Sequence, residues 1–154
     1  MRPPEPRTVR PAVAADTRAV TDLVRLAYEP YVPRIGRPPA PMTVDYEQAI
    51  ADAAVWVVDA DDRIVGVVVL RDAPDHLLIE NVAVHPDEQG RGLGSALLAY
   101  AEARARILGR DDVQLYTHEL MIENVTYYRH RGYEEVARRT EDGFRRVFFR
   151  KILT

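Results

Sequence analysis

The chain has 154 residues, of which 47% are hydrophobic and 29% are charged, and its formal net charge at pH 7 is −3. This length and composition predict one globular domain. The negative net charge gives no general attraction to nucleic acid, and the absence of cysteine excludes disulfides, thiolate metal ligands and a cysteine nucleophile. No apolar run is long enough to span a bilayer. We therefore expect a cytoplasmic protein without a nucleic-acid or membrane partner.

The N-terminal part predicts a strand followed by a helix. Residues 1–6 are proline-rich and carry no signal-peptide pattern, so we expect a flexible leader before a single domain of residues 7–154. Residues 7–13 are typical of a short strand. Asp16 is expected to cap a helix whose apolar residues continue to Ala27 with helical spacing.

The next segment is dense in proline. Five prolines fall in the twelve residues from Pro30 to Pro41, and each proline fixes φ and removes a backbone donor. We expect an irregular loop here, either a wall of a binding site or an exposed connector. A second short helix is expected from Thr43 to Ile50.

The remaining elements alternate between strands and helices. Residues 54–60 and 63–71 predict a hairpin around Asp61-Asp62, and residues 76–86 predict a third strand. Apolar residues at helical spacing then predict a long helix over residues 91–108. The elements expected after it are a strand (112–118), a helix (120–132) and a hairpin of two strands (132–140 and 144–153). The order β-α-α-β-β-β-α-β-α-β-β predicts an α/β fold with a mixed sheet covered by helices.

Three glycines occur where the third strand of this middle region passes into the long helix. Gly90, Gly92 and Gly94 are expected in the approach to the helix and in its first turn, where backbone N–H groups have no intrahelical partner. These donors and the positive end of the helix dipole suit a phosphate group, and glycine allows a close approach. Each glycine inside a helix costs about 1 kcal/mol of helix propensity, so a merely structural turn would rarely contain so many.

Two familiar phosphate motifs do not fit these glycines. A nucleotide P-loop needs Lys-Ser or Lys-Thr after its last glycine, and here Gly94 is followed by Ser95-Ala96. A dinucleotide fingerprint needs glycine or alanine where Ser95 stands, and an early βαβ unit. Neither of these nucleotide-binding classes is indicated.

The segment Gln89-Gly90-Arg91-Gly92-Leu93-Gly94 resembles the Gln/Arg-x-x-Gly-x-Gly/Ala signature of the GNAT superfamily, the acetyl-CoA-dependent N-acetyltransferases. The preceding VAVHPDEQ resembles the end of that family's fourth strand, and YYRHRGYEEV resembles its later Tyr-x-x-x-Gly-aromatic segment. The element order over residues 7–153 also follows the family. The resemblance therefore implies a GNAT fold of about seven mostly antiparallel strands flanked by four helices.

The resemblance implies where acetyl-CoA binds. In the family the fourth strand splays from the fifth, and the pantetheine arm bonds to the main chain of the fourth strand as an added strand would. Pyrophosphate would be held by the glycine loop, where Arg91 either adds charge or is simply solvated. The implied cofactor-binding residues are Val82, Ala83, Val84, Gln89, Gly90, Arg91, Gly92, Leu93, Gly94, Ser95 and Asn124.

The resemblance also implies two catalytic residues. Glu80 lies on a strand with apolar neighbours on both faces, where burial would raise the pKa of its carboxyl towards a value suited to a general base; an ion pair with arginine is the structural alternative. Asn81 is expected to face the other side of that strand. Tyr128, four residues after Asn124 on the same helix face, is expected to protonate the leaving thiolate; the alternative is a core aromatic residue. Tyr127 is expected to point elsewhere.

The acceptor side is less determined. By resemblance, its wall includes Tyr28, Tyr31 and Arg34, and His118 lies at the end of the fifth strand near the cleft. Glu29 or Asp45 would suit a cationic substrate, whereas Arg34 or Arg37 would suit a carboxylate, and the sequence does not decide. The four histidines have no metal-ligand spacing, so no metal is implied.

The leading hypothesis is an N-acetyltransferase that moves an acetyl group from acetyl-CoA to a primary amine of a small molecule or peptide by direct attack in a ternary complex. A non-catalytic acyl-CoA-binding or regulatory module on the same fold would need neither Glu80 nor Tyr128. A protein-interaction domain would bind no cofactor. Homodimers through the terminal hairpin are common in the resembling family, but no residue here decides the oligomeric state.

Overall fold

The computed structural model describes residues 8–154, so the expected leader and Arg7 lie outside the described residues. Its sheet has seven strands in the order β1-β2-β3-β4-β5-β7-β6. These are β1 (Val9–Pro11), β2 (Val55–Ala60), β3 (Arg63–Asp72), β4 (Leu77–Val84), β5 (Asp112–His118), β6 (Glu134–Glu141) and β7 (Phe144–Ile152). Among the described strands, β4 and β5 form the one parallel pair, and the other neighbours are antiparallel. The expected mixed, mostly antiparallel sheet is confirmed.

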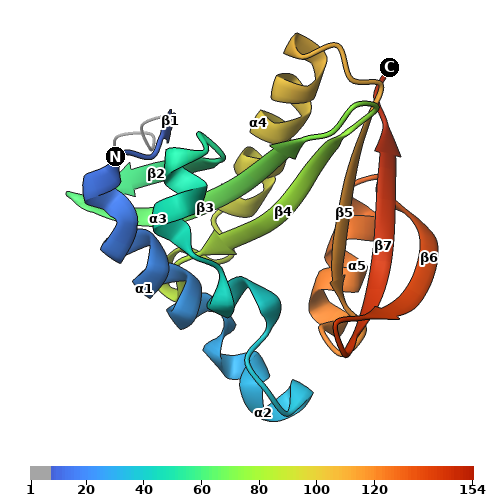
Figure 1. Ribbon diagram of the computed structural model, residues 1–154, viewed down its shortest axis with the longest axis horizontal. Helices are drawn as coiled ribbons and strands as arrows, with labels where there is room; N and C mark the ends of the chain where they lie inside the picture. Colours follow the sequence, from blue (N-terminus) through green and yellow to red (C-terminus); the bar gives the residue numbers. More distant parts are fainter. Residues whose placement is uncertain (1–7) are drawn as a thin grey trace.

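Helices cover the two faces of this sheet (Figure 1). They are α1 (Thr17–Tyr28), α2 (Val32–Ile35), α3 (Tyr46–Ala51), α4 (Leu93–Ile107) and α5 (Ile122–His130). Helices α1 and α3 bury apolar side chains such as Val20 and Ile50 against one face of β2 to β4. Helices α4 and α5 bury Leu97 and Val125 in a second cluster on the other face. Each face thus has its own core, as expected for strands that are apolar on both sides.

Three expectations about local structure are wrong. The second short helix begins at Tyr46 rather than at Thr43, because Asp45 caps it by accepting from the Gln48 N–H. The long helix begins at Leu93 rather than at residue 91, because Gly92 before it has a left-handed backbone with φ of 81°. The proline-rich segment from Pro30 to Pro41 is not irregular, since it forms short 3-10 turns and the one-turn helix α2. Proline is compatible with the first turn of a helix, where its missing N–H would have no partner.

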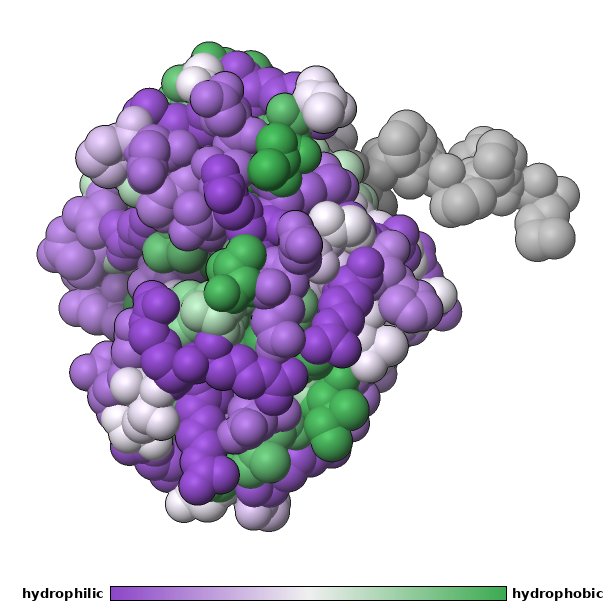
Figure 2. Space-filling model, turned by 90° about the vertical axis from the view of Figure 1, so that its right-hand side faces the viewer, coloured by the Kyte–Doolittle hydropathy of each residue, from purple (hydrophilic) through white to green (hydrophobic). Residues whose placement is uncertain are grey.

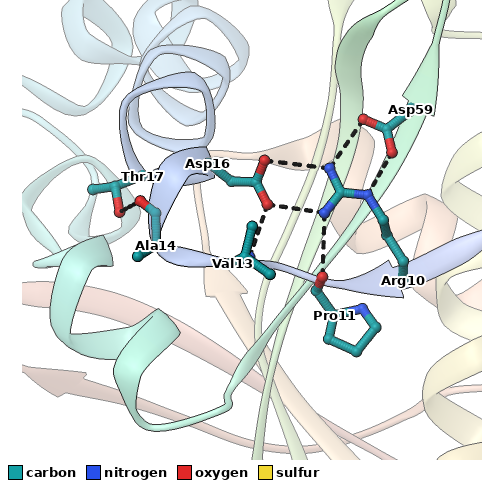
Figure 3. A network of polar contacts seen from close by, with 7 residues as sticks. All are labelled: Arg10, Pro11, Val13, Ala14, Asp16, Thr17 and Asp59. Atoms are coloured by element: carbon teal, nitrogen blue, oxygen red, sulfur yellow. Dashed lines mark hydrogen bonds and ion pairs between the residues drawn. The ribbon is translucent and has the colours of Figure 1, made fainter.

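Asp16 stands before α1 but does not cap it with its side chain. Its carboxylate accepts a hydrogen bond from the Val13 N–H at 2.8 Å and from Arg10 at 2.9 Å, and Arg10 also reaches Asp59 on β2 at 2.6 Å (Figure 3). Arg10 is therefore the main cause that lowers the pKa of Asp16. The residue ties the start of α1 to the edge of the sheet, rather than satisfying the helix donors.

The outer surface of the C-terminal half is mostly hydrophilic. Figure 2 shows hydrophobic side chains there as separate patches between hydrophilic ones. Arginines stack on aromatic rings of β5 and β7: Arg139 lies 3.8 Å from the ring centre of Phe148, and Arg146 lies 4.4 Å from that of Tyr116. Cationic groups favour the faces of such rings. This stacking covers aromatic surface with charge.

Candidate active site

The sheet opens between β4 and β5. The two strands pair only from Leu77 to Ile79, opposite Val113 to Leu115, and beyond this point no pairing joins them. The expected splay of the fourth strand from the fifth is thus present. A cavity system lies along this opening, so the residues of β4 after Ile79 line it from one side.

The main chain of β4 has unpaired groups at this opening. His85 donates from its backbone N–H to Val65 on β3 at 2.8 Å, and antiparallel pairs alternate between bonded and non-bonded positions. Ala83 therefore belongs to the β3 ladder, whereas the backbone groups of Val82 and Val84 point away from β3. The Val82 carbonyl accepts a hydrogen bond from the Tyr28 hydroxyl at 2.9 Å, which is consistent with this direction.

The glycine loop follows directly after β4. Gly90 and Gly92 both have φ of 81°, a backbone that other residues rarely adopt, and a Cβ at either position would meet no atom within 4 Å. Gly94 lies inside the first turn of α4, and a Cβ there would come within 3.2 Å of the Tyr127 hydroxyl. No side chain caps the start of α4, so its first backbone N–H groups remain available to an anion.

Two cavities meet in the opening. The long cleft, of about 510 Å³, runs past the glycine loop and the start of α4, and the inner pocket, of about 50 Å³, lies between β4, β5 and the segment 39–41. Four residues line both cavities: Tyr28, Val82, Asn124 and Tyr128. A ligand in the long cleft can therefore meet a ligand in the inner pocket at these four residues.

Tyr128 stands at this junction with a buried ring and a free hydroxyl. Its ring packs against Tyr133 and Phe149, with centroids 6.1 Å and 5.9 Å away. Among the described residues no partner forms a hydrogen bond with its hydroxyl, and burial raises its pKa above the ordinary value. The phenol is therefore protonated at neutral pH, and its O–H group is available to donate a hydrogen bond to a ligand.

Glu80 occupies a β-bulge. Val69 on β3 lies opposite Asn81, and Leu70 lies opposite Ile79, which leaves Glu80 as an extra residue on β4. Because of this bulge, Glu80 and Asn81 both line the inner pocket, and the expectation that Asn81 faces the other way is wrong.

The Glu80 carboxylate is paired and only partly buried. Arg71 donates from Nε to its Oε2 at 3.1 Å, and 27% of the side chain is exposed, which is less burial than the apolar sequence context indicates. Oε1 accepts no hydrogen bond from the described residues, so one oxygen remains available in the pocket. Arg71 also binds Asp52 at 3.0 Å, so its positive charge is shared between the carboxylates of Glu80 and Asp52.

A chain of hydrogen bonds fixes the wall between α1, β4 and α3. Tyr28 donates to the Asn81 side-chain oxygen at 2.7 Å, and the Asn81 amide donates to the Tyr46 hydroxyl at 3.0 Å. Tyr46 in turn donates to the Pro41 carbonyl at 2.6 Å. Burial raises the pKa of Tyr28 well above its usual range. The network holds the segment 39–41 against the sheet and so defines the inner pocket.

Comparisons with known proteins show which family the chain belongs to. The family model described as "Acetyltransferase (GNAT) domain" matches residues 51–135, which include the opening, the glycine loop and α5. The chain belongs to the GNAT acetyltransferase family. No curated protein matches the chain.

Solved structures support the GNAT fold over almost the whole chain. The N-acetyltransferase PaiA from Thermoplasma acidophilum, in complex with coenzyme A, has a TM-score of 0.81 at 14% identity and covers 96% of this chain and 99% of its own. YncA from Salmonella typhimurium, a putative acetyltransferase with acetyl-CoA, has a TM-score of 0.72 at 21% identity and covers 97% and 95%. The ribosomal-protein-S18-alanine N-acetyltransferase from Escherichia coli has a TM-score of 0.72 at 18% identity and covers 95% and 93%.

Within this GNAT domain, the expected cofactor residues lie together along the long cleft. Asn124 and Tyr128 are both at the junction, and Asn124 donates to Thr117 at 3.4 Å. Arg91 differs, because its side chain is 67% exposed, lies 3.7 Å from Glu88 and does not line the cleft.

The expected acceptor residues are distributed differently. Tyr31 lines the long cleft rather than the inner pocket. Arg34 lines neither cavity; it binds Glu123 at 2.8 Å and the Leu120 carbonyl at 3.1 Å, and so joins α2 to the C-terminal half. His118 does line the inner pocket, as the sequence indicated.

Sequence reasoning missed several residues of the long cleft, among them Tyr127 and Arg131. The Tyr127 hydroxyl lies 3.1 Å from Ser95 in the first turn of α4, so the side chain that was expected to point elsewhere also reaches the cleft. Arg131 lines the cleft, with its guanidinium 5.2 Å from the centre of the Tyr127 ring and no carboxylate partner among residues 8–154. Arg131 follows Tyr127 by four residues, about one helical turn, so the sequence could have indicated that the two side chains lie on the same side.

In residues 8–154, no three His, Asp or Glu side chains gather closely enough to hold a metal ion. No helix in this described range has the length and apolar character needed to cross a membrane.

Proposed function

We propose that this GNAT domain acetylates a primary amine by direct attack on acetyl-CoA bound in the long cleft. The observation that carries the proposal is the junction: the unpaired edge of β4, the free Tyr128 hydroxyl and the pocket containing Glu80 meet at one place. The presence of coenzyme A or acetyl-CoA in the similar structures of PaiA and YncA supports the choice of donor.

The long cleft fits coenzyme A in shape and chemistry. The backbone groups of Val82 and Val84 bond to no neighbouring strand, and their carbonyls accept only side-chain hydrogen bonds, from Tyr28 at 2.9 Å and Gln89 at 3.4 Å. This edge of β4 suits the amides of a pantetheine arm, which would extend the sheet as an added strand. The uncapped N–H groups at the start of α4 and the left-handed loop before it suit a pyrophosphate. We assign the cofactor's phosphates a further cation, Arg131, because it lines the cleft without a carboxylate partner among the described residues.

Glu80 is proposed as the general base. An aliphatic ammonium has a pKa of about 10.4, so it must lose a proton before its nitrogen can attack the thioester carbon. Glu80 lines a pocket that opens at the junction, and its carboxylate can accept this proton directly or through water. As the C–N bond forms and the C–S bond breaks, the electron pair of the C–S bond leaves on sulfur. The nitrogen loses its second proton when the amide forms, and this proton passes to the leaving thiolate directly or through water.

Tyr128 is proposed to stabilise the leaving sulfur. Its hydroxyl is free and protonated, so it can donate to the developing thiolate. The ordinary pKa of tyrosine, about 10, already exceeds that of a thiol, about 8.5, and burial raises the pKa of Tyr128 further. Hydrogen bonding therefore contributes more than complete proton transfer. The Val82 N–H at the unpaired edge is suited to polarise the thioester carbonyl.

The non-catalytic alternative leaves this arrangement unexplained, since a binding module needs neither the bulged Glu80 nor the free Tyr128 hydroxyl. The absence of cysteine also disfavours a covalent acyl-enzyme. Direct attack in a ternary complex is therefore the proposed route. The cysteine-free composition also agrees with a cytoplasmic location, which remains part of the proposal.

The test is calorimetric titration with acetyl-CoA, followed by a thiol-release assay with a panel of primary amines. Binding together with amine-dependent thiol release supports the proposal, and intersecting double-reciprocal plots support direct attack. Binding without release on any amine would favour the non-catalytic module, and no binding would favour an interaction domain.

A further inference from the structure

The walls of the inner pocket are apolar and aromatic. On one side lies the segment 39–41, and on the other lie Tyr116 of β5, Phe144 of β7 and Met121 before α5. The centre of a water molecule can occupy only about 50 Å³ between these walls, so the pocket is narrow and suits a slim group rather than a folded peptide chain. Apolar surface of this kind stabilises an apolar substrate group by removing it from water.

The cation that lines this pocket is already balanced by the protein. Arg146 lies 3.0 Å from Glu141 and 3.9 Å from Asp142, and its guanidinium stacks 4.4 Å from the ring centre of Tyr116. Arg146 is thus paired with Glu141, which also binds Arg139 at 2.7 Å, and only 11% of the Arg146 side chain is exposed. Its charge is therefore less available to a carboxylate of the substrate.

His118 does not supply a cation either. Its Nδ1 accepts a hydrogen bond from the Leu120 N–H at 3.0 Å, which fixes the ring in the form protonated only on Nε2. Burial lowers the pKa of His118 below its ordinary value. The ring lies edge-on to Phe144 at 6.1 Å and adds to the aromatic wall.

The charged residues that the sequence offered for substrate recognition do not line the inner pocket: Glu29, Arg34, Arg37 and Asp45. Arg37 stacks 3.5 Å from the ring centre of Phe144 and donates to the Asp142 carbonyl, so it closes the outside of the pocket and does not line it. Asp45 accepts from the Gln48 N–H and caps α3. Neither the carboxylate-binding nor the second cation-binding alternative has a group inside the pocket.

One carboxylate remains with an available oxygen, that of Glu80 next to the junction. Among the described residues that line the inner pocket, Glu80 is therefore the one acidic side chain, at the end where the thioester carbon would lie, and the one arginine, Arg146, is already paired. We infer that the acceptor is a primary amine on a slim apolar chain or ring that carries no second charged group. This inference rests on the proposed acetyltransferase function and names its substrate class.

Matched amine pairs test the inference in the thiol-release assay. The first pair is 2-phenylethylamine and L-phenylalanine, which differ by a carboxylate, and the second is n-hexylamine and 1,6-diaminohexane, which differ by an ammonium. We expect kcat/KM to be at least about 100-fold higher for the uncharged-tail member of each pair, since a buried charge without a partner is costly. The acceptor-free rate of thiol release is subtracted.

A variant pair on β7 identifies the wall responsible. Phe144→Ala should lower the preference for 2-phenylethylamine over methylamine, as a ratio of kcat/KM, by about tenfold. Phe148→Ala removes the same type of side chain four residues further along β7, at a position that does not line the pocket. It should leave the ratio within about twofold. Circular dichroism and calorimetry with acetyl-CoA are the controls that both variants are folded and bind the donor.

The outcomes separate this inference from the proposed function. Faster turnover of L-phenylalanine or the diamine would overturn the substrate class while leaving the acetyltransferase function intact. Equal ratios in the two variants would also contradict the assignment of the wall. Acetyl-CoA binding without turnover of any probe would contradict the proposed function together with the inference.

Discussion

The long cleft and the inner pocket present different parts of the chain to their ligands. The long cleft offers mainly main chain: the unpaired edge of β4, the left-handed glycines and the uncapped start of α4. The inner pocket offers side chains from α1, β4, β5 and β7, together with the segment 39–41. One cavity therefore depends on backbone conformation, whereas the other depends on residue identity, and substitutions should affect them differently.

The largest expected effect belongs to the side-chain cavity. Glu80→Gln should lower kcat/KM for an active amine by at least about 100-fold and leave acetyl-CoA affinity within about twofold, because the change removes a base and not a backbone contact. Asp52→Asn is the matched control, since Asp52 is the other carboxylate on Arg71. An equal loss in Asp52→Asn would show that the ion pair with Arg71, rather than the base, matters.

Tyr128→Phe should lower kcat by about 30-fold, the effect of one hydrogen bond to a charged leaving group. Tyr127→Phe is the matched control, because its hydroxyl bonds to Ser95 near the glycine loop and not at the junction. Steady-state kinetics with saturating acetyl-CoA measure both. A larger loss of kcat in Tyr127→Phe than in Tyr128→Phe would show that Tyr127, and not Tyr128, stabilises the leaving sulfur.

For the main-chain cavity, Gly92→Ala should destabilise the fold by about 1–2 kcal/mol, since φ of 81° is unfavourable with a Cβ. It should also raise the Kd of acetyl-CoA by about tenfold by changing the direction of the loop amides. Gly109→Ala, at φ of 74° beyond the end of α4, should cost similar stability without changing the Kd. Urea unfolding and calorimetry separate the two effects, and a normal Kd in Gly92→Ala would break the comparison.

A smaller effect is expected for the side chain that the long cleft does use. Arg131→Gln should raise the Kd of coenzyme A by about fivefold and reduce its dependence on salt, as removal of one partly exposed charge contact does. Arg129→Gln is the control, because Arg129 is bound to Glu135 and lies outside the cleft. No difference between these variants would leave phosphate binding to the main chain alone.

The smallest effect is spectroscopic and tests how dry the junction is. Burial raises the pKa of Tyr28, Tyr46 and Tyr128, so these phenols should stay protonated above pH of about 10, where exposed tyrosines ionise. Because the folded pKa exceeds the unfolded one, the stability they contribute falls as pH rises above about 10. Their ultraviolet phenolate signal should therefore appear together with loss of circular dichroism. Full ionisation in folded protein would mean that water reaches the junction.

The sequence revealed the main-chain cavity better than the side-chain one. The Gln89–Gly94 segment, the strand before it and the helix after it are contiguous, and periodicity locates each of them. The element order and the sheet type could be predicted for the same reason. The predicted start of α4 was wrong by two residues, because the spacing of apolar residues does not reveal the left-handed backbone of Gly92.

The inner pocket could not be predicted because its walls come from segments far apart in the chain. Nothing local indicates that Arg34 binds Glu123 or that Arg37 stacks on Phe144, so both arginines looked available for substrate. The bulge at Glu80 was also hidden, since a strand pattern does not show which residue lacks an opposite partner. Pairing partners, and not residue types, decided these roles.

The short parallel ladder between β4 and β5 has a mechanical consequence. Within residues 8–154, the four-stranded and three-stranded blocks of the sheet are joined only by the pairing of Leu77–Ile79 with Val113–Leu115. An acetyl-CoA molecule that bonds to β4 and also contacts α5 would hold the two blocks of the sheet together. Binding should therefore slow hydrogen exchange in β5, although β5 itself would gain no new backbone partner.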